Sequence, residues 1–133
     1  MILDCLIVIK PWLDKILSGE KDMEIRGICT HKRGTIGLIE SGSGQIKGIV
    51  NISDCIELDK QKFDNSVDRH RITGDVWDKL PYKKKFGWIL ENPVRLEKPI
   101  GYKHPRGTVV WVKVDVPVRI QHGKAYIKGF DKQ

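Results

Sequence analysis

The sequence predicts an α+β fold in which a small mixed-strand β-barrel carries two or three short helices on its outside. Three observations lead to this class. The chain contains about five to seven runs with strand patterns, successive runs are mostly joined by hairpin-type turns, and the helical patterns are few and short. With 133 residues, the chain is long enough to bury a core as one domain without disulfide or metal support.

The N-terminal segment predicts a strand followed by a helix. Leu3 to Ile9 form a nearly continuous apolar run, which is typical of a buried strand. Pro11 suits the first turn of a helix, and the apolar residues of "PWLDKILS" form i, i+4 pairs over two turns. Gly19 then predicts the end of this helix.

A short charged segment follows the predicted helix. In "DMEIR", Met23 and Ile25 alternate with Glu24 and Arg26, and this alternation predicts a half-buried strand. Alternate residues of a strand point to the same face. Glu24 and Arg26 are therefore expected side by side, with Lys21 on the loop that precedes them.

The next segment predicts a β-hairpin. Two alternating runs between Thr35 and Ser53 are joined by the turn sequence "SGSG" at residues 41–44. Gly37 and Gly48 lie inside these two strands, where a glycine indicates a bulge or the close approach of another chain segment.

The second half of the chain predicts short helices and then further strands. Short helices are expected in the polar region from Asp59 to Leu80. Asp59 or Asn65 could cap the start of a helix, and Pro81 would end the last one. Strands are expected at "KKKFGWILENPVRL" and "GTVVWVKVDV", with "EKPIGYKHPRG" as a loop between them. One more strand is expected at Ala125 to Lys128, followed by a frayed end.

The composition is that of a soluble globular protein, with 40% hydrophobic and 31% charged residues. The first apolar run reaches Lys10 and Pro11 far short of the roughly 20 residues that span a bilayer, and it lacks the basic start of a signal peptide. Three cysteines without paired spacing fit a reducing compartment. We therefore expect a cytoplasmic protein that does not contact a membrane.

Positive charge is concentrated in one part of the chain. The net charge is +7, and eight basic residues but only two acidic residues lie between Lys79 and Arg106. A positive field of this kind favours polyanions such as RNA or DNA. A solvated basic face that only aids solubility is an equally good interpretation of charge alone.

Three segments carry a resemblance to a known family: "IKPWLDKILSGEKDMEIR", "GTIGLIE" and "FGWILENPVRLEKPIGYKHPRGTVVW". Together they resemble the ASCH family of the PUA-like superfamily of small β-barrels. The family block G-x-K-x-x-E-x-R is matched by Gly19, Lys21, Glu24 and Arg26. The resemblance implies a PUA-like domain over residues 1–114 and a C-terminal extension over residues 115–133.

The resemblance also implies a site. It places Lys21, Glu24 and Arg26 in a cleft beside the first helix, where the family is proposed to bind RNA or modified nucleosides. Some similar proteins hydrolyse N4-acetylcytidine with a lysine and a threonine of this block and a distant glutamate, and nuclease activity is ascribed to at least one member. Here Lys21 matches the lysine, whereas Glu24 stands at the threonine position, so the hydroxyl nucleophile is missing.

Further residues are candidates for contacts with such a ligand. Trp12 is expected at the mouth of the cleft as a stacking platform for a base, although a core role is an equal alternative. His104 lies on a basic loop, where it could act as a general acid or base or simply be solvated. The basic residues Lys83, Lys84, Lys85, Lys103 and Arg106 are expected to contact the backbone of an RNA ligand.

No cofactor or metal is predicted. Cys29 and His31 form a C-x-H pair without a second pair at zinc-finger spacing, and phosphate-loop and dinucleotide fingerprints are absent from the sequence.

Three functional hypotheses follow. The favoured one is a module that binds RNA or a nucleotide through the charged block. The second is a small hydrolase, either an amidohydrolase on an acylated nucleoside or a ribonuclease, in which Lys21 and Glu24 transfer protons. The third is an adaptor whose basic face meets an acidic protein partner. Without the family resemblance, a surface ion-pair network is the better explanation of Lys21, Glu24 and Arg26, and the resemblance is what favours a ligand site.

Overall fold

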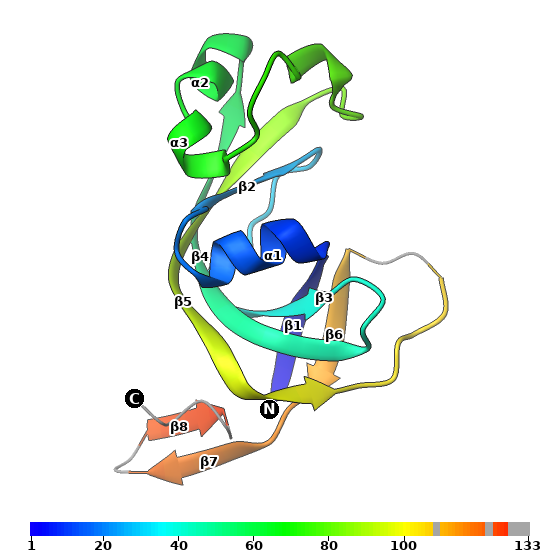
Figure 1. Cartoon of the computed structure of the whole chain (residues 1–133). Helices are drawn as coiled ribbons and strands as arrows, with labels where there is room; N and C mark the ends of the chain where they lie inside the picture. Colours follow the sequence, from blue (N-terminus) through cyan, green and yellow to red (C-terminus); the bar gives the residue numbers. More distant parts are fainter. Residues whose placement is uncertain (108–109, 122–123, 128–133) are drawn as a thin grey trace.

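The structure is a computed structural model that describes residues 1–107, 110–121 and 124–127. Its main sheet has six strands in the order β2-β5-β4-β3-β1-β6 (Figure 1). The strands are β1 Ile2–Val8, β2 Met23–Arg26, β3 Gly34–Glu40, β4 Gln45–Leu58, β5 Lys85–Gly101 and β6 Trp111–Asp115. The helices are α1 Lys10–Leu17, α2 Lys60–Asp64, α3 Val67–His70 and the 3-10 helix η1 Trp77–Lys79.

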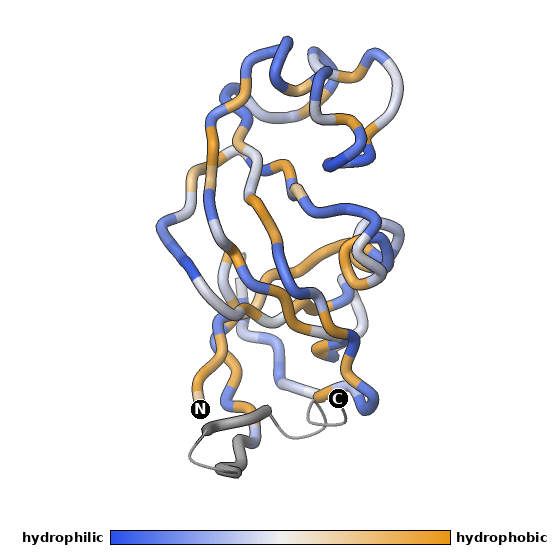
Figure 2. The backbone as a smooth tube through the Cα atoms, turned by 90° about the vertical axis from the view of Figure 1, so that its left-hand side faces the viewer, coloured by the Kyte–Doolittle hydropathy of each residue, from blue (hydrophilic) through white to orange (hydrophobic). Residues whose placement is uncertain are grey.

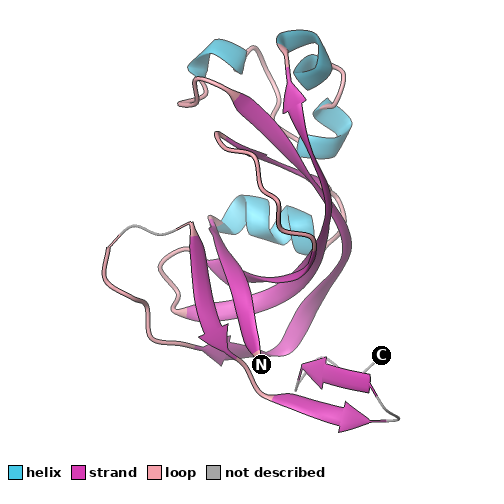
Figure 3. Cartoon of the chain, turned by 180° about the vertical axis from the view of Figure 1, so that it is seen from behind, coloured by secondary structure: helices cyan, strands magenta, loops and turns pink. Residues whose placement is uncertain are grey.

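The predicted class is confirmed as a small α+β fold with a mixed sheet. β1 and β3 are parallel, whereas every other neighbouring pair of the sheet is antiparallel. The sheet curls in the manner of a barrel, but β2 and β6 end it as separate edges, so it is open rather than closed. The long strands β4 and β5 curve around α1, as the front and rear views both show (Figures 1 and 3).

The hydrophobic core has three parts, and two of them lie on opposite faces of β1, which carries apolar side chains on both. Leu6 and Val8 point toward α1 and pack with Trp88, which is fully buried. Leu3 and Cys5 point to the opposite face and pack with residues of β4, β5 and β6. Hydrophobic colours follow the strands in Figure 2, and hydrophilic colours gather around the segment that contains α2 and α3.

The glycines of the predicted hairpin mark close contacts, as expected. A Cβ on Gly37 would lie 2.5 Å from the Cys5 Sγ atom, and a Cβ on Gly48 would lie 2.7 Å from the Val94 carbonyl oxygen. The strand register also shifts beside each glycine, between Leu38 and Ile39 and between Ile46 and Gly48. Both explanations that the sequence offered, a bulge and a close approach, therefore apply.

The expected loop after Leu96 is wrong in part. The segment from Glu97 to Gly101 belongs to β5, where Ile100 pairs with Ile46 and Gly101 with Gln45. Pro99 cannot donate to a ladder, but it lies in the stretch where the register between β4 and β5 shifts. A bulge thus lets the strand continue past a residue that usually ends one.

The helical region between β4 and β5 is confirmed. Asp59 caps α2 by accepting a hydrogen bond from the Lys62 backbone N–H at 2.8 Å. Asn65, the other candidate cap, stands at the C-terminal end of α2 instead. None of the helices in the described ranges is long and apolar enough to cross a membrane.

The C-terminal segment contains more structure than expected. A second, two-stranded sheet is formed by β7 Val118–Gln121 and β8 Lys124–Ile127, where a single strand at residues 125–128 was expected. Residue 128 and the expected frayed end lie outside the described residues. Val116, between the two sheets, is buried, and its N–H donates to the Met1 carbonyl oxygen at 2.9 Å. The expected boundary at residue 114, between the PUA-like domain and the C-terminal extension, stays a prediction.

Candidate functional site: a charged cleft between α1 and β2

Lys21 is positioned by the turn that ends α1. Gly19 adopts φ = 85°, a left-handed conformation that favours glycine, and its N–H donates to the Ile16 carbonyl oxygen at 3.0 Å. The Lys21 N–H then bonds the Lys15 carbonyl oxygen at 2.9 Å. The chain therefore folds back beside α1 and enters β2 with the Lys21 side chain directed inward.

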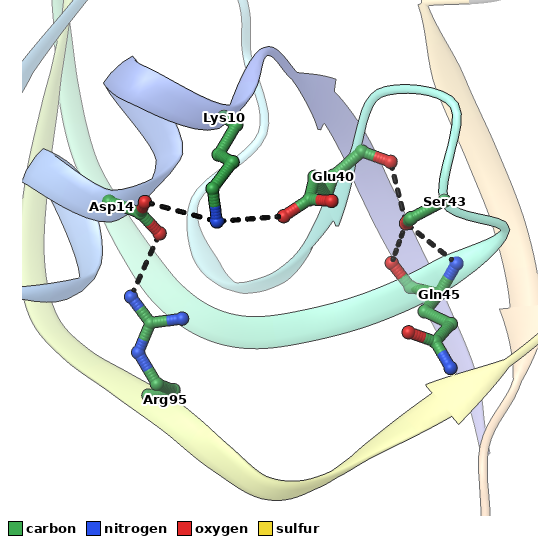
Figure 4. Close-up of polar contacts among 6 residues, drawn as sticks. All are labelled: Lys10, Asp14, Glu40, Ser43, Gln45 and Arg95. Carbon is green, nitrogen blue, oxygen red and sulfur yellow. Dashed lines mark hydrogen bonds and ion pairs between the residues drawn. The ribbon is translucent and has the colours of Figure 1, made fainter.

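The helix itself is fixed to the sheet by surface ion pairs at its outer face (Figure 4). The Lys10 Nζ atom lies 3.6 Å from Asp14 and 3.9 Å from Glu40 on β3. Asp14 in turn lies 3.1 Å from an Arg95 nitrogen on β5. α1 is thus tied to two different strands.

Lys21 is a buried cation, with only 2% of its surface exposed. Its Nζ atom donates to the His70 carbonyl oxygen at 2.6 Å and lies 3.7 Å from the Glu24 Oε1 atom. The same ammonium lies 4.7 Å from the centre of the Trp12 ring, which is a cation–π distance. Burial lowers the pKa of Lys21, and the nearby Glu24 carboxylate opposes this effect without cancelling it.

Glu24 is a buried carboxylate between two cations. Arg26 donates to the Glu24 Oε2 atom from Nε at 3.0 Å and lies within 2.8 Å of it through Nη2. Arg26 Nη2 also donates to the Ile7 carbonyl oxygen at 3.0 Å. The expectation that Glu24 and Arg26 share one face of the strand and meet Lys21 is therefore confirmed.

The expectation of a half-buried strand is wrong, because β2 is covered on both faces. Met23 and Ile25 are buried in a core cluster with Phe63, and Glu24 on the other face is only 7% exposed. A contact distant in sequence helps to hold this cover: Arg69 of α3 donates to Asp22 at 3.0 Å.

These charged groups border a pocket of about 340 Å³, within the usual range of ligand pockets. Trp12 and Tyr82 supply aromatic walls, and Arg26 remains 25% exposed at its side chain. The pocket combines a buried carboxylate, two cations and two aromatic rings. The residues lining it are Ile7, Val8, Ile9, Trp12, Lys21, Glu24, Ile25, Arg26, Ile72, Leu80, Pro81 and Tyr82.

The sequence model of the ASCH domain matches residues 6–100, which is more than half of the chain. The chain belongs to the ASCH domain family. A search of curated protein sequences gives no match.

Solved structures with the same fold include the ASCH protein of Zymomonas mobilis, with a TM-score of 0.60 at 13% identity over 74% of this chain and 72% of the other. A serine-to-alanine mutant of that protein gives 0.66 at 11% identity over 84% and 87%. A tyrosine-to-phenylalanine mutant gives 0.58 at 13% identity over 74% of both chains. At these identities, the likeness concerns the fold alone.

The basic residues that were predicted to contact the RNA backbone lie in different places in the structure. Lys83 and Lys84 are exposed and follow Tyr82 directly, but neither of them lines the cleft itself. Lys85 is only 7% exposed, and its Nζ atom lies 4.2 Å from the centre of the Trp77 ring. Its charge therefore faces a structural aromatic residue rather than the cleft rim.

The other predicted contacts do not line the cleft. Lys103, His104 and Arg106 are exposed on the segment that follows β5. The His104 Nδ1 atom lies 3.1 Å from the Tyr102 hydroxyl oxygen, and both residues line a different pocket. Within the described ranges, no group of three or more His, Cys, Asp or Glu residues could hold a metal ion.

Sequence reasoning missed Tyr82 as a wall of the cleft. The available signal was its position: an aromatic residue directly before three lysines in "PYKKK" is the combination that nucleic-acid sites use. Ile72, Leu80 and Pro81 were missed too, because only the folded chain brings the region after α3 over β2.

Proposed function

We propose that this ASCH domain binds RNA and holds one nucleotide in the cleft between α1 and β2. The observation that supports the proposal most is the Glu24 carboxylate, buried between Lys21 and Arg26 at the border of a pocket with two aromatic walls. An ion-pair network that only stabilised a surface would not need a pocket of nucleotide size beside it. Aromatic walls bind bases by stacking, and cations meet carbonyl or phosphate oxygens.

The polar groups also favour certain bases. Both Arg26 contacts to Glu24 involve Oε2, whereas Oε1 lies at 3.7 Å from Lys21, beyond hydrogen-bond distance. Oε1 can therefore accept from the amino group of a base, and the partly exposed guanidinium of Arg26 can donate to a carbonyl oxygen beside it. Cytosine presents an amino group and a carbonyl on its pairing edge, and guanine presents both as well. Uracil has no amino group, so it should bind more weakly.

The proposal is tested by fluorescence anisotropy with a labelled single-stranded RNA at several salt concentrations. We expect the Lys21→Ala, Arg26→Ala double variant to bind at least about tenfold more weakly, a loss of about 1.4 kcal/mol. The matched control is the Lys60→Ala, Lys62→Ala double variant, which removes the same charge from α2, outside the cleft lining. It should bind within about twofold of the unmodified protein at matched salt.

Circular dichroism and thermal melting establish that both double variants are folded. Two results would contradict the proposal. One is RNA binding that is absent or insensitive to salt, and the other is an affinity that does not change in the Lys21→Ala, Arg26→Ala double variant.

One observation favours a second function, that of a small hydrolase. The pKa of Lys21 is lowered by burial, which brings its amine closer to a state that can accept a proton from water or a substrate. Glu24 opposes this shift and supplies no hydroxyl nucleophile. Incubation with N4-acetylcytidine and with RNA, each with and without a divalent metal, tests the idea. The hydrolase function is contradicted if the unmodified protein shows no more turnover than the Lys21→Ala variant.

A further inference from the structure

A second pocket, of about 560 Å³, lies beside the cleft. Its walls come from the end of β1, from the turn between β3 and β4, and from the segment after β5. The lining residues are Ile7, Ile39, the turn 41–44, Tyr102 and His104. The function proposed for the cleft does not use this pocket.

The two pockets meet at Ile7. Its carbonyl oxygen accepts the hydrogen bond from Arg26 in the first cleft, whereas its side chain packs with the apolar cluster that includes Ile39 and Tyr102. β6 begins its pairing with β1 at Leu6, which lies opposite Trp111. Among the described residues, therefore, no strand pairs with β1 at Ile7 on the β6 side, and the two pockets share this residue.

The second pocket offers stacking surfaces. The rings of Tyr102 and His104 pack edge to face, with centroids 5.9 Å apart at an angle of 68°. Tyr102 is half-buried and His104 is exposed, so these rings border the opening, while Ile7 and Ile39 form an apolar floor. Aromatic rings above an apolar floor suit the flat face of a base.

The same pocket lies beside groups that suit a phosphate. Lys103 and Arg106 are exposed on the segment that carries His104. Gly42 and Gly44 have φ values of 80° and 66°, and their lack of side chains lets a ligand approach the backbone of the turn. The pocket and the residues beside it therefore offer groups that suit a base and a phosphate.

The pocket is held in shape by the protein's own hydrogen bonds. The Ser43 hydroxyl donates to the Glu40 carbonyl oxygen at 2.7 Å and accepts from the Gln45 N–H at 3.1 Å, as Figure 4 shows. The Tyr102 N–H donates to the Gly44 carbonyl oxygen at 3.1 Å, which ties the segment after β5 to the turn. Binding in a pocket that is already formed avoids the entropic cost of ordering it.

We infer that the second pocket binds the nucleotide adjacent to the one in the cleft, so that the ligand is a single RNA strand of at least two nucleotides that crosses β1 at Ile7. This inference rests on the proposed function of the cleft and names its substrate class: a strand rather than a free nucleoside or mononucleotide.

The test compares the affinities of cytidine monophosphate and of a cytidine tetranucleotide, measured by isothermal titration calorimetry. The unmodified protein should bind the tetranucleotide at least about tenfold more tightly, because a second base adds its own stacking energy. The Tyr102→Ala, His104→Ala double variant should lose this advantage and keep its affinity for the mononucleotide. The exposed His31→Ala variant, outside both pockets, should behave as the unmodified protein does.

His104 is exposed, so the single variant His104→Ala keeps the test valid if loss of Tyr102 unfolds the chain. It should weaken tetranucleotide binding at least about fivefold. The inference is overturned if the tetranucleotide gains nothing over the mononucleotide, or if its advantage survives both second-pocket variants. The proposed function fails in a different way, since mononucleotide binding would then be absent or unaffected by Lys21→Ala with Arg26→Ala.

Discussion

At the scale of single residues, Glu24 decides the electrostatics of the cleft. A carboxylate with only 7% of its surface exposed is costly unless it is paired, and here it has Arg26 on one oxygen and Lys21 near the other. Lys21 likewise depends on Glu24, because the other groups around its ammonium are the His70 carbonyl and the Trp12 ring. The three charges therefore act as one unit, in which loss of the central member leaves two cations facing each other.

Glu24→Gln should destabilise the fold, since it keeps the shape of the side chain but removes the charge between Lys21 and Arg26. We expect a loss of about 1–3 kcal/mol in the free energy of unfolding, below the full cost of breaking a buried pair because Arg26 is partly exposed. Urea unfolding at pH 7 measures this loss. The control is Glu57→Gln at an exposed site on β4. Equal midpoints for the two variants would contradict the account.

His70 should make stability depend on pH. Its ring is fully buried and stacks on the Phe63 ring, with 4.1 Å between the ring centres. The His70 Nδ1 atom accepts a hydrogen bond from the Ile72 N–H at 3.0 Å. The Nε2 atom therefore carries the proton and donates to the Phe63 carbonyl oxygen. Burial lowers the pKa of His70 in the folded state. The unfolded value is about 6.5, so stability is fully present above that pH and is lost as the pH falls below it through the folded pKa.

The charged groups near His70 are Lys21, Asp64 and Asp68, of which Lys21 lowers its pKa further. Because the His70 carbonyl holds Lys21, RNA affinity should decline over the same pH range. Urea midpoints between pH 7.5 and pH 5.5 test this for the unmodified protein and for His70→Asn, which should lose most of the dependence. A midpoint that stays constant in the unmodified protein over this interval would contradict the assignment.

At the scale of elements, the close contact at Gly48 is what lets α1 lie against β4 and β5. A Cβ here would meet the Leu17 side chain of α1 and the Val94 carbonyl oxygen of β5. Gly48→Ala should therefore cost about 1–3 kcal/mol in the free energy of unfolding, as overpacking typically does. The matched control is Gly101→Ala, where nothing lies within 4 Å of the added atom. Thermal melting compares them, and similar melting temperatures would show that α1 can move aside.

Elements with local signals were predictable from the sequence. Pro11 and Gly19 bound α1 because each acts on its own backbone, and the alternation in "DMEIR" places Glu24 and Arg26 on one face through strand geometry. The candidate site was predictable to the same extent, since Lys21, Glu24 and Arg26 lie within six residues of one another.

What depends on distant contacts could not be predicted. Pro99 ordinarily ends a strand, and β5 continues past it because the long strand β4 remains beside it. Three consecutive lysines carry no signal for which one is buried, so the place of Lys85 over Trp77 appears only in the structure. The cover over β2 depends on Asp22 and Arg69, which are 47 positions apart.

At the scale of the whole molecule, the proposed function assigns a general attraction for RNA to the net charge of +7 and a specific one to the cleft. The two contributions differ in their response to salt. Contacts to phosphates release counterions, so the logarithm of affinity falls with the logarithm of salt concentration by about 0.7 per phosphate on a single strand. Contacts to a base in a closed pocket respond much less.

Lys83→Ala with Lys84→Ala should therefore weaken RNA binding for all sequences and reduce the slope with salt by about one to two, because both lysines are exposed and directly follow Tyr82, a wall of the cleft. The preference for cytidine over uridine should remain. Anisotropy titrations at four salt concentrations with two oligonucleotides measure both quantities. An unchanged slope together with an altered base preference would place these lysines inside the recognition site instead.

The central claim is that the cleft between α1 and β2 holds a nucleotide, and a ¹H–¹⁵N NMR titration of the unmodified protein with cytidine monophosphate tests it most directly. We predict that the largest changes in chemical shift fall on the backbone amides of Lys21, Glu24 and Arg26 and on the indole of Trp12. Uridine monophosphate should shift the same signals with weaker affinity. Shifts confined to other parts of the molecule, or none at millimolar nucleotide, would contradict the claim.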